Sequence, residues 1–244
     1  MSSNDAWRSL SKDYETARGR HDSLDRLLEW AAQRDLMGTI GGKDILDVGC
    51  GNGEKAIELA CGGARSVLGL DIAANFLTPP GGLEVTLAAG DLSDLGSLQS
   101  VQGRTFDRVL FLQSLGYAAD QVATLRATRS LLRDDGVLII SRAHPIRFAV
   151  ERAERDNVGL GDAYHATDPY SYRSGWNADV SVTHATDTFS SMVNSLVTAG
   201  FWIEEISEPK LTAEQKERFP DKQAWLARYV GVIIFRARPN LGLQ

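Results

Sequence analysis

The sequence predicts a three-layer α/β/α sandwich built on a mostly parallel sheet of seven strands. From Asp44 onward, short apolar runs alternate with segments long enough for crossover helices, which is typical of a parallel sheet covered on both faces. Nearly continuous apolar runs, such as Val109–Leu112, suit central strands buried on both sides. The predicted strands are Ile45–Val48, Ser66–Leu70, Glu84–Leu87, Phe106–Leu112, Val137–Ile140, Trp202–Ile206 and Tyr229–Phe235.

The same pattern divides the chain, whose 244 residues fit a single α/β domain. Residues 1–43 carry leucines at helical spacing and are predicted to form a helical cap before the core of residues 44–144. Residues 184–244 supply a helix and the last two strands. The intervening residues 145–183 are rich in Tyr, Asp, Gly and Arg. Because such folds build substrate covers from insertions beyond strand ends, this segment is predicted to be a lid.

Composition argues against several classes of partner. The net charge is −6 and no basic run occurs, whereas nucleic-acid binding draws on clustered Lys and Arg. Arginines in residues 147–155 alternate with glutamates at four-residue spacing, as on a solvated helix face. The polar N-terminus, the lack of a membrane-length apolar run and two cysteines without metal spacing predict a cytoplasmic protein with no membrane partner. The oligomeric state stays open, with a homodimer as one option.

A glycine-rich loop after the first strand is the strongest functional signal. Gly49, Gly51 and Gly53 follow Asp47, and a helix opens at Glu54. Glycines let the backbone turn sharply and approach a ligand, and a helix N-terminus presents unpaired N–H groups. A dinucleotide fingerprint requires Gly or Ala where Glu54 stands, and a carboxylate there would face a pyrophosphate. The loop therefore favours a cofactor without phosphate over NAD.

This loop resembles the first motif of the class I S-adenosylmethionine (SAM)-dependent methyltransferases, (D/E)xGxGxG. Asp47, Gly49, Gly51 and Gly53 match it fully, and Cys50 lies within it. The resemblance implies that the loop packs against the methionine part of SAM and that Asp47 helps to hold its amino group. The resemblance is firm over residues 44–142. It also implies that the last strand of the sheet inserts antiparallel to its neighbours.

Two acidic residues after later strands continue the resemblance. Asp71, beside Ile72, ends the second strand 20 residues beyond Gly51, where a carboxylate can accept both hydrogen bonds of a ribose diol. The alternative is that Asp71 only caps a helix beginning at Ile72. Asp91 and Leu92 resemble the motif that contacts adenine, although Asp91 also suits a polar turn.

Two further segments are assigned by resemblance. The end of the fourth strand, Leu112, Gln113 and Ser114, is implied to face the transferred methyl group. Trp7 and Tyr14 match an aromatic pattern that opens many of these enzymes, in which the Tyr closes over the methionine end of SAM. Tyr14 packing a terminal helix is the alternative. By their chemistry rather than by resemblance, Tyr117, Tyr170, Tyr172 and Trp176 are predicted to contact the acceptor, because such aromatic side chains suit an aromatic or cationic molecule. The alternative is that the aromatic residues of the insertion only pack the lid together.

Methyl transfer from a sulfonium requires mainly alignment, close approach and exclusion of water. A general base is needed only when the acceptor holds a proton of high pKa. His144, at the end of the fifth strand, and His184, after the lid, are the candidates. The segment around His184 is similar to one in bacterial small-molecule methyltransferases, although their neighbouring Arg is Ala185 here. No histidine pair has metal-ligand spacing, so no metal is predicted.

The sequence thus predicts transfer of a methyl group from SAM to an O, N or C atom of a small metabolite, with S-adenosylhomocysteine as product. A bacterial biosynthetic role is implied by the resemblance. Two alternatives stay open: a cyclase-like enzyme that binds SAM without methylating, and a non-catalytic SAM-binding regulator. An NAD(P) reductase is disfavoured by Glu54.

Overall fold

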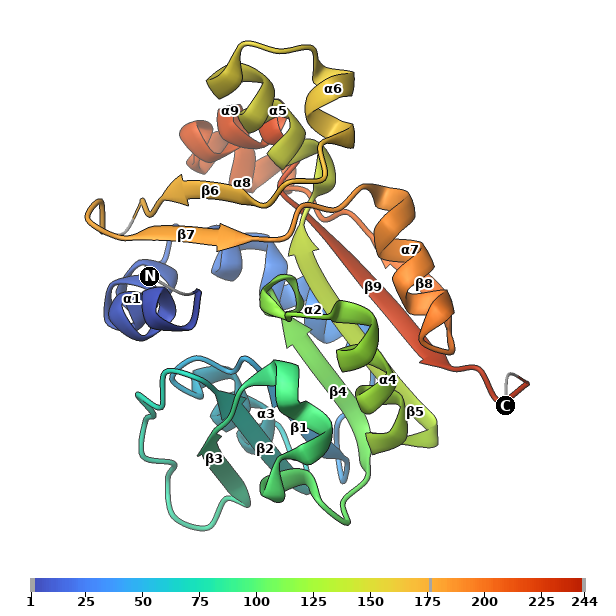
Figure 1. The fold of residues 1–244 in the computed structure, drawn as a ribbon. Coiled ribbons are helices and arrows are strands. Elements are labelled where there is room, and N and C mark those ends of the chain that lie inside the picture. The colour runs from blue at the N-terminus through green and yellow to red at the C-terminus, as the bar shows by residue number, and fades with distance from the viewer. Residues whose placement is uncertain (1–2, 176, 243–244) are drawn as a thin grey trace.

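A seven-stranded sheet forms the centre of the computed structural model, which describes residues 3–175 and 177–242 (Figure 1). Its strand order is β3-β2-β1-β4-β5-β9-β8, and only β9 runs antiparallel to its neighbours. This arrangement confirms the predicted fold class, including the antiparallel last strand. The strands are β1 (Asp44–Val48), β2 (Ser66–Asp71), β3 (Val85–Ala89), β4 (Phe106–Leu112), β5 (Leu132–Ala143), β8 (Phe201–Ser207) and β9 (Val232–Pro239).

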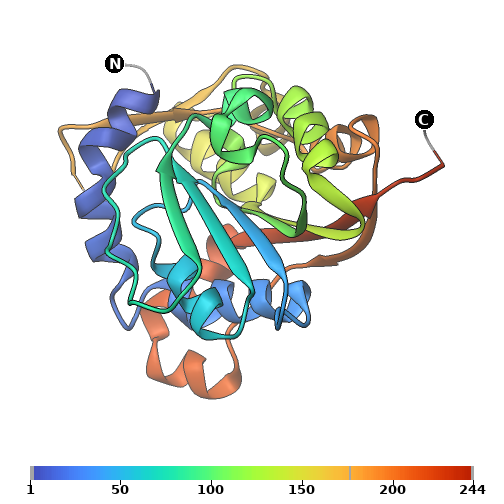
Figure 2. The same ribbon diagram turned by 90° about the horizontal axis from the view of Figure 1, so that it is seen from below.

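Helices cover both faces of the sheet, which gives the three layers seen in Figure 2. On one face α4 (Gln121–Leu131) and α7 (Phe189–Thr198) pack against β5, β8 and each other. On the other face α2 (Trp30–Met37) and α3 (Glu54–Cys61) pack against β2, β3, β5 and β9. Alternation along β1 supplies both cores, because Leu46 and Val48 join one apolar cluster and Ile45 the other. Strand β4 is flanked by three short 3₁₀ segments: η2 (Leu92–Ser97), η3 (Gln99–Val101) and η4 (Leu115–Tyr117).

Two strands begin elsewhere than predicted. β5 starts at Leu132 rather than Val137, because Leu132 already pairs with Phe106 before a bulge in the register. The last strand starts at Val232, and Tyr229 instead ends a helix. Val230 and Gly231 both have positive φ, of 65° and 91°, and they turn the chain from that helix into β9. An apolar run of this kind does not reveal a turn hidden inside it.

The segments predicted as cap and lid consist of separate small elements. Residues 1–43 form α1 (Ser3–Arg18), a π-helical turn η1 (Asp25–Glu29) and α2. Residues 145–183 form α5 (Pro145–Asp156), α6 (Leu160–His165) and most of a hairpin of β6 (Tyr170–Arg173) and β7 (Ser181–His184). Two helices precede β9: α8 (Ala213–Arg218) and α9 (Pro220–Tyr229). Arg147 and Glu151 of α5 form an ion pair of 2.9 Å, but their side chains are only 30% and 22% exposed, so this face of the helix is not the solvated one that the sequence predicts. Arg155 pairs with Asp156 rather than with Glu151.

Helix α1 and the inserted hairpin pack against each other, although some 160 residues separate them in sequence (Figure 1). Ala6 and Leu10 of α1 form a buried cluster with Val180 and Val182, and Tyr172 packs at its edge. The two segments therefore make one continuous cover beside the sheet.

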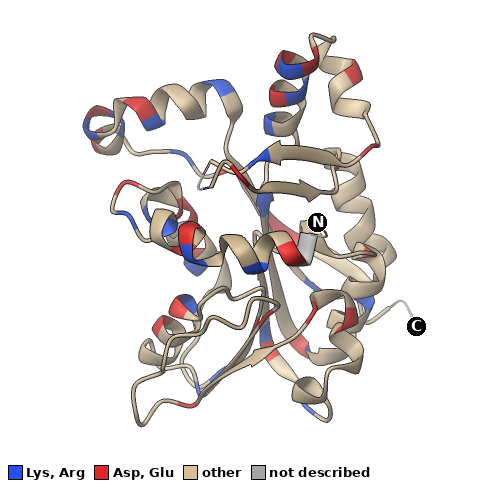
Figure 3. Ribbon diagram, turned by 60° about the vertical axis from the view of Figure 1, so that its left-hand side comes forward, with Lys and Arg blue, Asp and Glu red and all other residues tan. Residues whose placement is uncertain are grey.

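The surface carries charges of both signs. Figure 3 shows Lys and Arg interspersed with Asp and Glu along the helices. None of the helices described over residues 3–175 and 177–242 combines the length and the apolar composition needed to cross a membrane.

Truncating Leu10 should loosen this cover selectively. Leu10 is completely buried, so Leu10→Ala leaves a cavity and should cost about 2–5 kcal/mol in the local stability of the cover. Hydrogen exchange should accelerate for amides of α1 and β7 and stay unchanged in β1 and β4. Leu160→Ala, at a side chain that is 53% exposed, serves as the control. If hydrogen exchange accelerated equally in all strands of the sheet, α1 would not open independently of the sheet.

Candidate cofactor and acceptor site

A cavity lies at the carboxyl ends of β1, β2 and β4, and α1 forms its outer wall. Together with its mouth it encloses about 890 Å³. Ligands of open α/β sheets bind at this edge, where loops follow the strands. Most residues predicted to bind the cofactor line the cavity: Tyr14, Gly49, Gly51, Asp71, Ile72, Asp91, Leu92, Leu112, Gln113 and Ser114.

The glycine loop is held where side chains would not fit. Gly49 has φ of 80°, and a Cβ atom there would lie 2.3 Å from Cβ of Ser114. The Ser114 hydroxyl in turn donates to the carbonyl oxygen of Val48. Gly53 precedes α3 with φ of 85°, and its Cβ would meet the Leu87 side chain at 2.5 Å. Gly53 and the buried Cys50 lie outside the cavity lining, so they support the loop from behind.

Asp71 fastens this loop from the end of β2. Its Oδ2 accepts from the backbone N–H of Gly51 at 2.9 Å, and its Oδ1 accepts from that of Ala73 at 2.8 Å. Burial raises the pKa of Asp71, while these two N–H groups counteract the rise. Residues 72–80 are not helical, so the alternative of a helix cap does not occur. Each carboxylate oxygen keeps a second lone pair, so the group can still accept from a ligand diol.

Asp91 occupies the other end of the cavity with Leu92. Its Oδ1 accepts from the backbone N–H of Ser93 at 2.9 Å and so begins the 3₁₀ segment η2. The turn interpretation is therefore compatible with a position in the cavity wall. The Asp91 side chain can therefore begin the turn and line the cavity at the same time.

Asp47 provides a buried acceptor without a partner. The residue is 1% exposed, and its Oδ1 makes no hydrogen bond within the part of the chain that the structure describes. Burial raises the pKa of Asp47 to about 6, against the opposing influence of Lys55 and Arg18. Such an oxygen is costly to bury, so it fits the ammonium group of an amino-acid ligand. The structure places Asp47 behind the cavity lining rather than in it.

Two residues of α1 join the site without having been predicted. Arg18 donates to Oε2 of Glu15 at 2.8 Å, and Oε1 of Glu15 accepts from the backbone N–H of Asn52 at 3.3 Å. Burial raises the pKa of Glu15. Both side chains line the cavity. The only sequence signal is their spacing of three residues next to Tyr14, which also suits an ordinary surface pair.

A second, larger cavity adjoins the first. The two share Trp7, Tyr14, Arg18, Gln113 and Tyr117 as lining residues. Tyr172 and His184 also line the second cavity, so the structure brings Tyr117, Tyr172 and His184 together as predicted neighbours of an acceptor. Tyr170 stacks on Tyr172 at 5.9 Å between ring centroids and lies outside the lining. Trp176 lies outside the described residues.

His184 is held as a neutral acceptor in this cavity. Its Nδ1 donates to the carbonyl oxygen of Ala185 at 2.8 Å, and its Nε2 is buried without a hydrogen-bond partner among residues 3–175 and 177–242. The Phe148 ring lies 4.2 Å away between centroids. Burial lowers the pKa of His184 to about 4. The free lone pair of Nε2 can therefore accept a hydrogen bond at neutral pH.

His144 lies in a different environment. Its Nδ1 accepts from the backbone N–H of Ile146 at 3.2 Å and caps α5, and its Nε2 lies 2.8 Å from Oε1 of Glu208. The side chain is buried and lines neither cavity. Both ring nitrogens are engaged in contacts that fix the start of α5.

Glu29 is a further cavity residue that the sequence did not indicate. It ends η1, lines the second cavity and accepts a hydrogen bond of 3.0 Å from the Gln113 side chain.

The chain is similar to known methyltransferases both in sequence and in fold. A family model for a methyltransferase domain matches residues 41–170. The fold superposes on an S-adenosylmethionine-dependent methyltransferase from Mesorhizobium loti with a TM-score of 0.70 and 27% identity, covering 86% of this chain and 97% of that one.

Two curated relatives match part of the chain. A ubiquinone biosynthesis O-methyltransferase of Neisseria meningitidis is 28% identical over 144 residues, which are 56% of this chain and 57% of that enzyme. A tRNA U34 carboxymethyltransferase of Aeromonas hydrophila is 28% identical over 131 residues, which are 51% of this chain and 40% of that enzyme. The matched part is therefore about half the length of these two relatives.

Adding one methyl group at Gly49 should weaken cofactor binding. The new Cβ would overlap Ser114, and φ of 80° is strained for any residue but glycine. Calorimetry should show a loss of at least about tenfold in SAM affinity for Gly49→Ala, because the loop must shift away from the ligand. Gly81→Ala, at a position with nothing within 4 Å, should bind as the wild type does. Equal affinities in both variants would contradict the proposed role of the loop.

His184 should make stability depend on pH in a defined window. Its pKa is 6.5 ordinarily and about 4 in the fold, so between these values the unfolded chain binds more protons. The free energy of unfolding should therefore fall as pH drops from about 6.5 to about 4, by up to about 1.4 kcal/mol per unit. Asp47, with its raised pKa, acts in the opposite direction.

Denaturant unfolding of the wild type and of His184→Asn across this range separates the two contributions, because Asp47 is common to both proteins. The Asn amide can still donate to Ala185. The stability of the variant relative to the wild type should rise as the pH is lowered. Parallel curves would mean that the imidazole is not held neutral.

Proposed function

The chain belongs to the methyltransferase-domain family and uses S-adenosylmethionine, and we propose that it methylates a small molecule held in the second cavity. The observation that carries this proposal is the junction of the two cavities at Gln113 and Tyr117. A cofactor in the first cavity and an acceptor in the second would meet there. Close approach in a fixed orientation is the main requirement of methyl transfer.

The residues of the first cavity suit the parts of this cofactor. The Asp71 carboxylate fits the ribose diol, and Asp91 and Leu92 fit the adenine. Asp47 lies behind this lining, and we propose that its partnerless oxygen receives the ammonium group through a bound water. Bound S-adenosylmethionine supplies an electrophilic methyl group. Tyr14 and the rest of α1 cover the cavity and would exclude water from the reaction.

The second cavity supports a small acceptor rather than a nucleic acid. Its wall is formed by α1, η1, α5 and the hairpin, and it includes the aromatic rings of Trp7, Tyr117, Phe148 and Tyr172. The net charge is −6, and the positive charges that line this cavity are matched by nearby carboxylates rather than concentrated as phosphates would require. The basic lining residues are Arg18, Arg20, Arg142, Arg147 and Lys222, and the acidic ones are Asp13, Asp22, Asp25 and Glu29. We assign to His184 the role of accepting a hydrogen bond from the acceptor through Nε2, and to His144 that of positioning α5.

Titration with cofactors tests the first part of this proposal. Calorimetry should show binding of SAM and S-adenosylhomocysteine and no binding of NADH. Asp71→Ala should weaken both adenosyl ligands by roughly 10- to 100-fold, because hydrogen bonds to a charged group are lost.

Asp134→Ala, at an exposed carboxylate of β5, is the matched control and should bind normally. Melting curves of both variants establish that each is folded. Binding of NADH in place of the adenosyl ligands would refute the assignment.

A further inference from the structure

We propose that Glu29 binds the acceptor and that this acceptor is an amine. The inference rests on the proposed function, because it concerns the chemistry of the second cavity. Four features carry it: the position of Glu29, its lack of an ion-pair partner, the aromatic rings that line the same cavity and the proton that an amine must lose.

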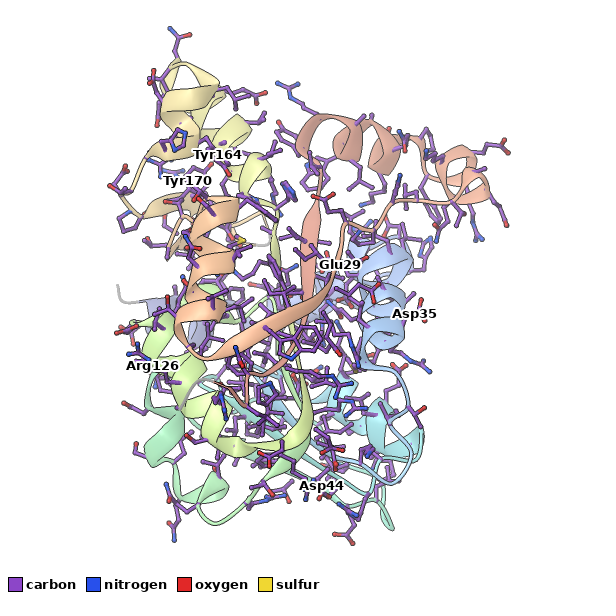
Figure 4. The ribbon with its side chains drawn as sticks, turned by 90° about the vertical axis from the view of Figure 1, so that its right-hand side faces the viewer. Glu29, Asp35, Asp44, Arg126, Tyr164 and Tyr170 are labelled. Atoms are coloured by element: carbon purple, nitrogen blue, oxygen red, sulfur yellow. The ribbon has the colours of Figure 1, made fainter. Side chains whose placement is uncertain are left out.

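Glu29 lies where cofactor and acceptor would meet. Its Oε2 accepts from the side-chain amide of Gln113, a residue that lines both cavities. Gln113 itself has φ of 66°, an uncommon conformation that places its side chain at the end of β4. Glu29 ends a π-helical turn, a rare geometry that often occurs at functional sites. In Figure 4 Glu29 lies among packed side chains, whereas Asp35 of the following helix lies at the surface.

The carboxylate of Glu29 is buried, and no cation of the described part of the chain is in direct contact with it. Its residue is 9% exposed, and no Lys, Arg or His among the described residues forms an ion pair with it. The nearby cations are committed elsewhere: Lys55 to Asp25, Arg18 to Glu15, Arg142 to Asp187 and Arg147 to Glu151. A buried, unpaired carboxylate is costly, and a cationic ligand offsets that cost.

The groups around Glu29 set its proton affinity. Burial and the neighbouring Asp25 raise the pKa of Glu29, whereas the Gln113 amide, Lys55 and Arg147 lower it. The net effect is a raised pKa, which makes the carboxylate a better proton acceptor than an exposed glutamate. Tyr14 also faces Glu29, and its own pKa is raised by burial.

Aromatic rings complete a site for an ammonium group. Tyr117, Tyr172 and Phe148 line the same cavity as Glu29. Ring faces attract a cation, and the attraction increases when water is excluded. A cavity that contains both a buried carboxylate and aromatic rings favours an alkylammonium over a neutral alcohol of the same shape.

The proton transfer follows from the reaction. An ammonium has no lone pair, so it must lose a proton before it can attack. One N–H bond breaks and the proton joins the Glu29 carboxylate as an O–H bond. The amine lone pair then forms the N–C bond while the methyl–sulfur bond breaks and its electron pair stays on sulfur. The positive charge passes from sulfur to nitrogen, and Glu29 returns its proton to water when the product leaves.

Matched ligand pairs test this proposal. Protein saturated with S-adenosylhomocysteine would be titrated with tyramine and tyrosol, and with hexylamine and hexanol, by calorimetry at pH 7.5. Each amine should bind at least about tenfold more tightly than its alcohol. Glu29→Gln keeps the acceptor oxygen for Gln113 and should remove that preference, whereas Asp35→Asn should retain it. Affinity for tyramine should fall as the pH is lowered and Glu29 becomes protonated.

The outcomes separate the two proposals. Equal binding of amine and alcohol, a preference that persists in Glu29→Gln, or no binding by either amine would overturn the amine assignment while leaving cofactor binding intact. Failure of the wild type to bind S-adenosylhomocysteine at the outset would instead overturn the proposed function. Melting curves and S-adenosylhomocysteine affinity equal to those of the wild type would establish that Glu29→Gln is folded.

Discussion

The close contact between Gly49 and Ser114 is the constraint on which the rest of the site depends. It brings the ends of β1 and β4 together without an intervening side chain. The loop that follows is then tied to β2, because the backbone N–H groups of Gly49 and Cys50 donate to the carbonyl oxygen of Leu70 and that of Gly51 donates to Asp71. Three neighbouring strands thus fix a short piece of backbone, and the cavity exists because Gly49 and Gly51 carry no side chains where they line it.

The site is notable for its unsatisfied acceptors. Asp47, His184 and Glu29 are all buried; Asp47 and His184 each have an atom without a hydrogen-bond partner among the described residues, and Glu29 forms no ion pair there. In a fold where the other buried polar groups are largely paired, such atoms have a cost. Their positions, one behind the first cavity and two in the second, match where donors of a cofactor and an acceptor would be received.

The fold could be predicted largely from local patterns. Apolar runs located the strands, since parallel strands buried on both faces leave a strong signal, and the glycine loop located the cavity. The parts that escaped prediction depend on contacts between distant segments. Nothing local distinguishes Glu29 or Glu15 from surface residues, because their burial is produced by β4 and the glycine loop. His144 looked like a candidate base because it ends a strand, but its ring is engaged at the start of α5.

Helix α1 forms part of the wall of both cavities and rests on the inserted hairpin. A ligand in either cavity would therefore contact and stabilise the same helix in this position. By thermodynamic linkage, occupancy of one cavity would then raise the affinity of the other, and the effect would be reciprocal. The demethylated cofactor and the methylated product would then each slow the departure of the other, so that turnover depends on how fast one N-terminal helix lifts.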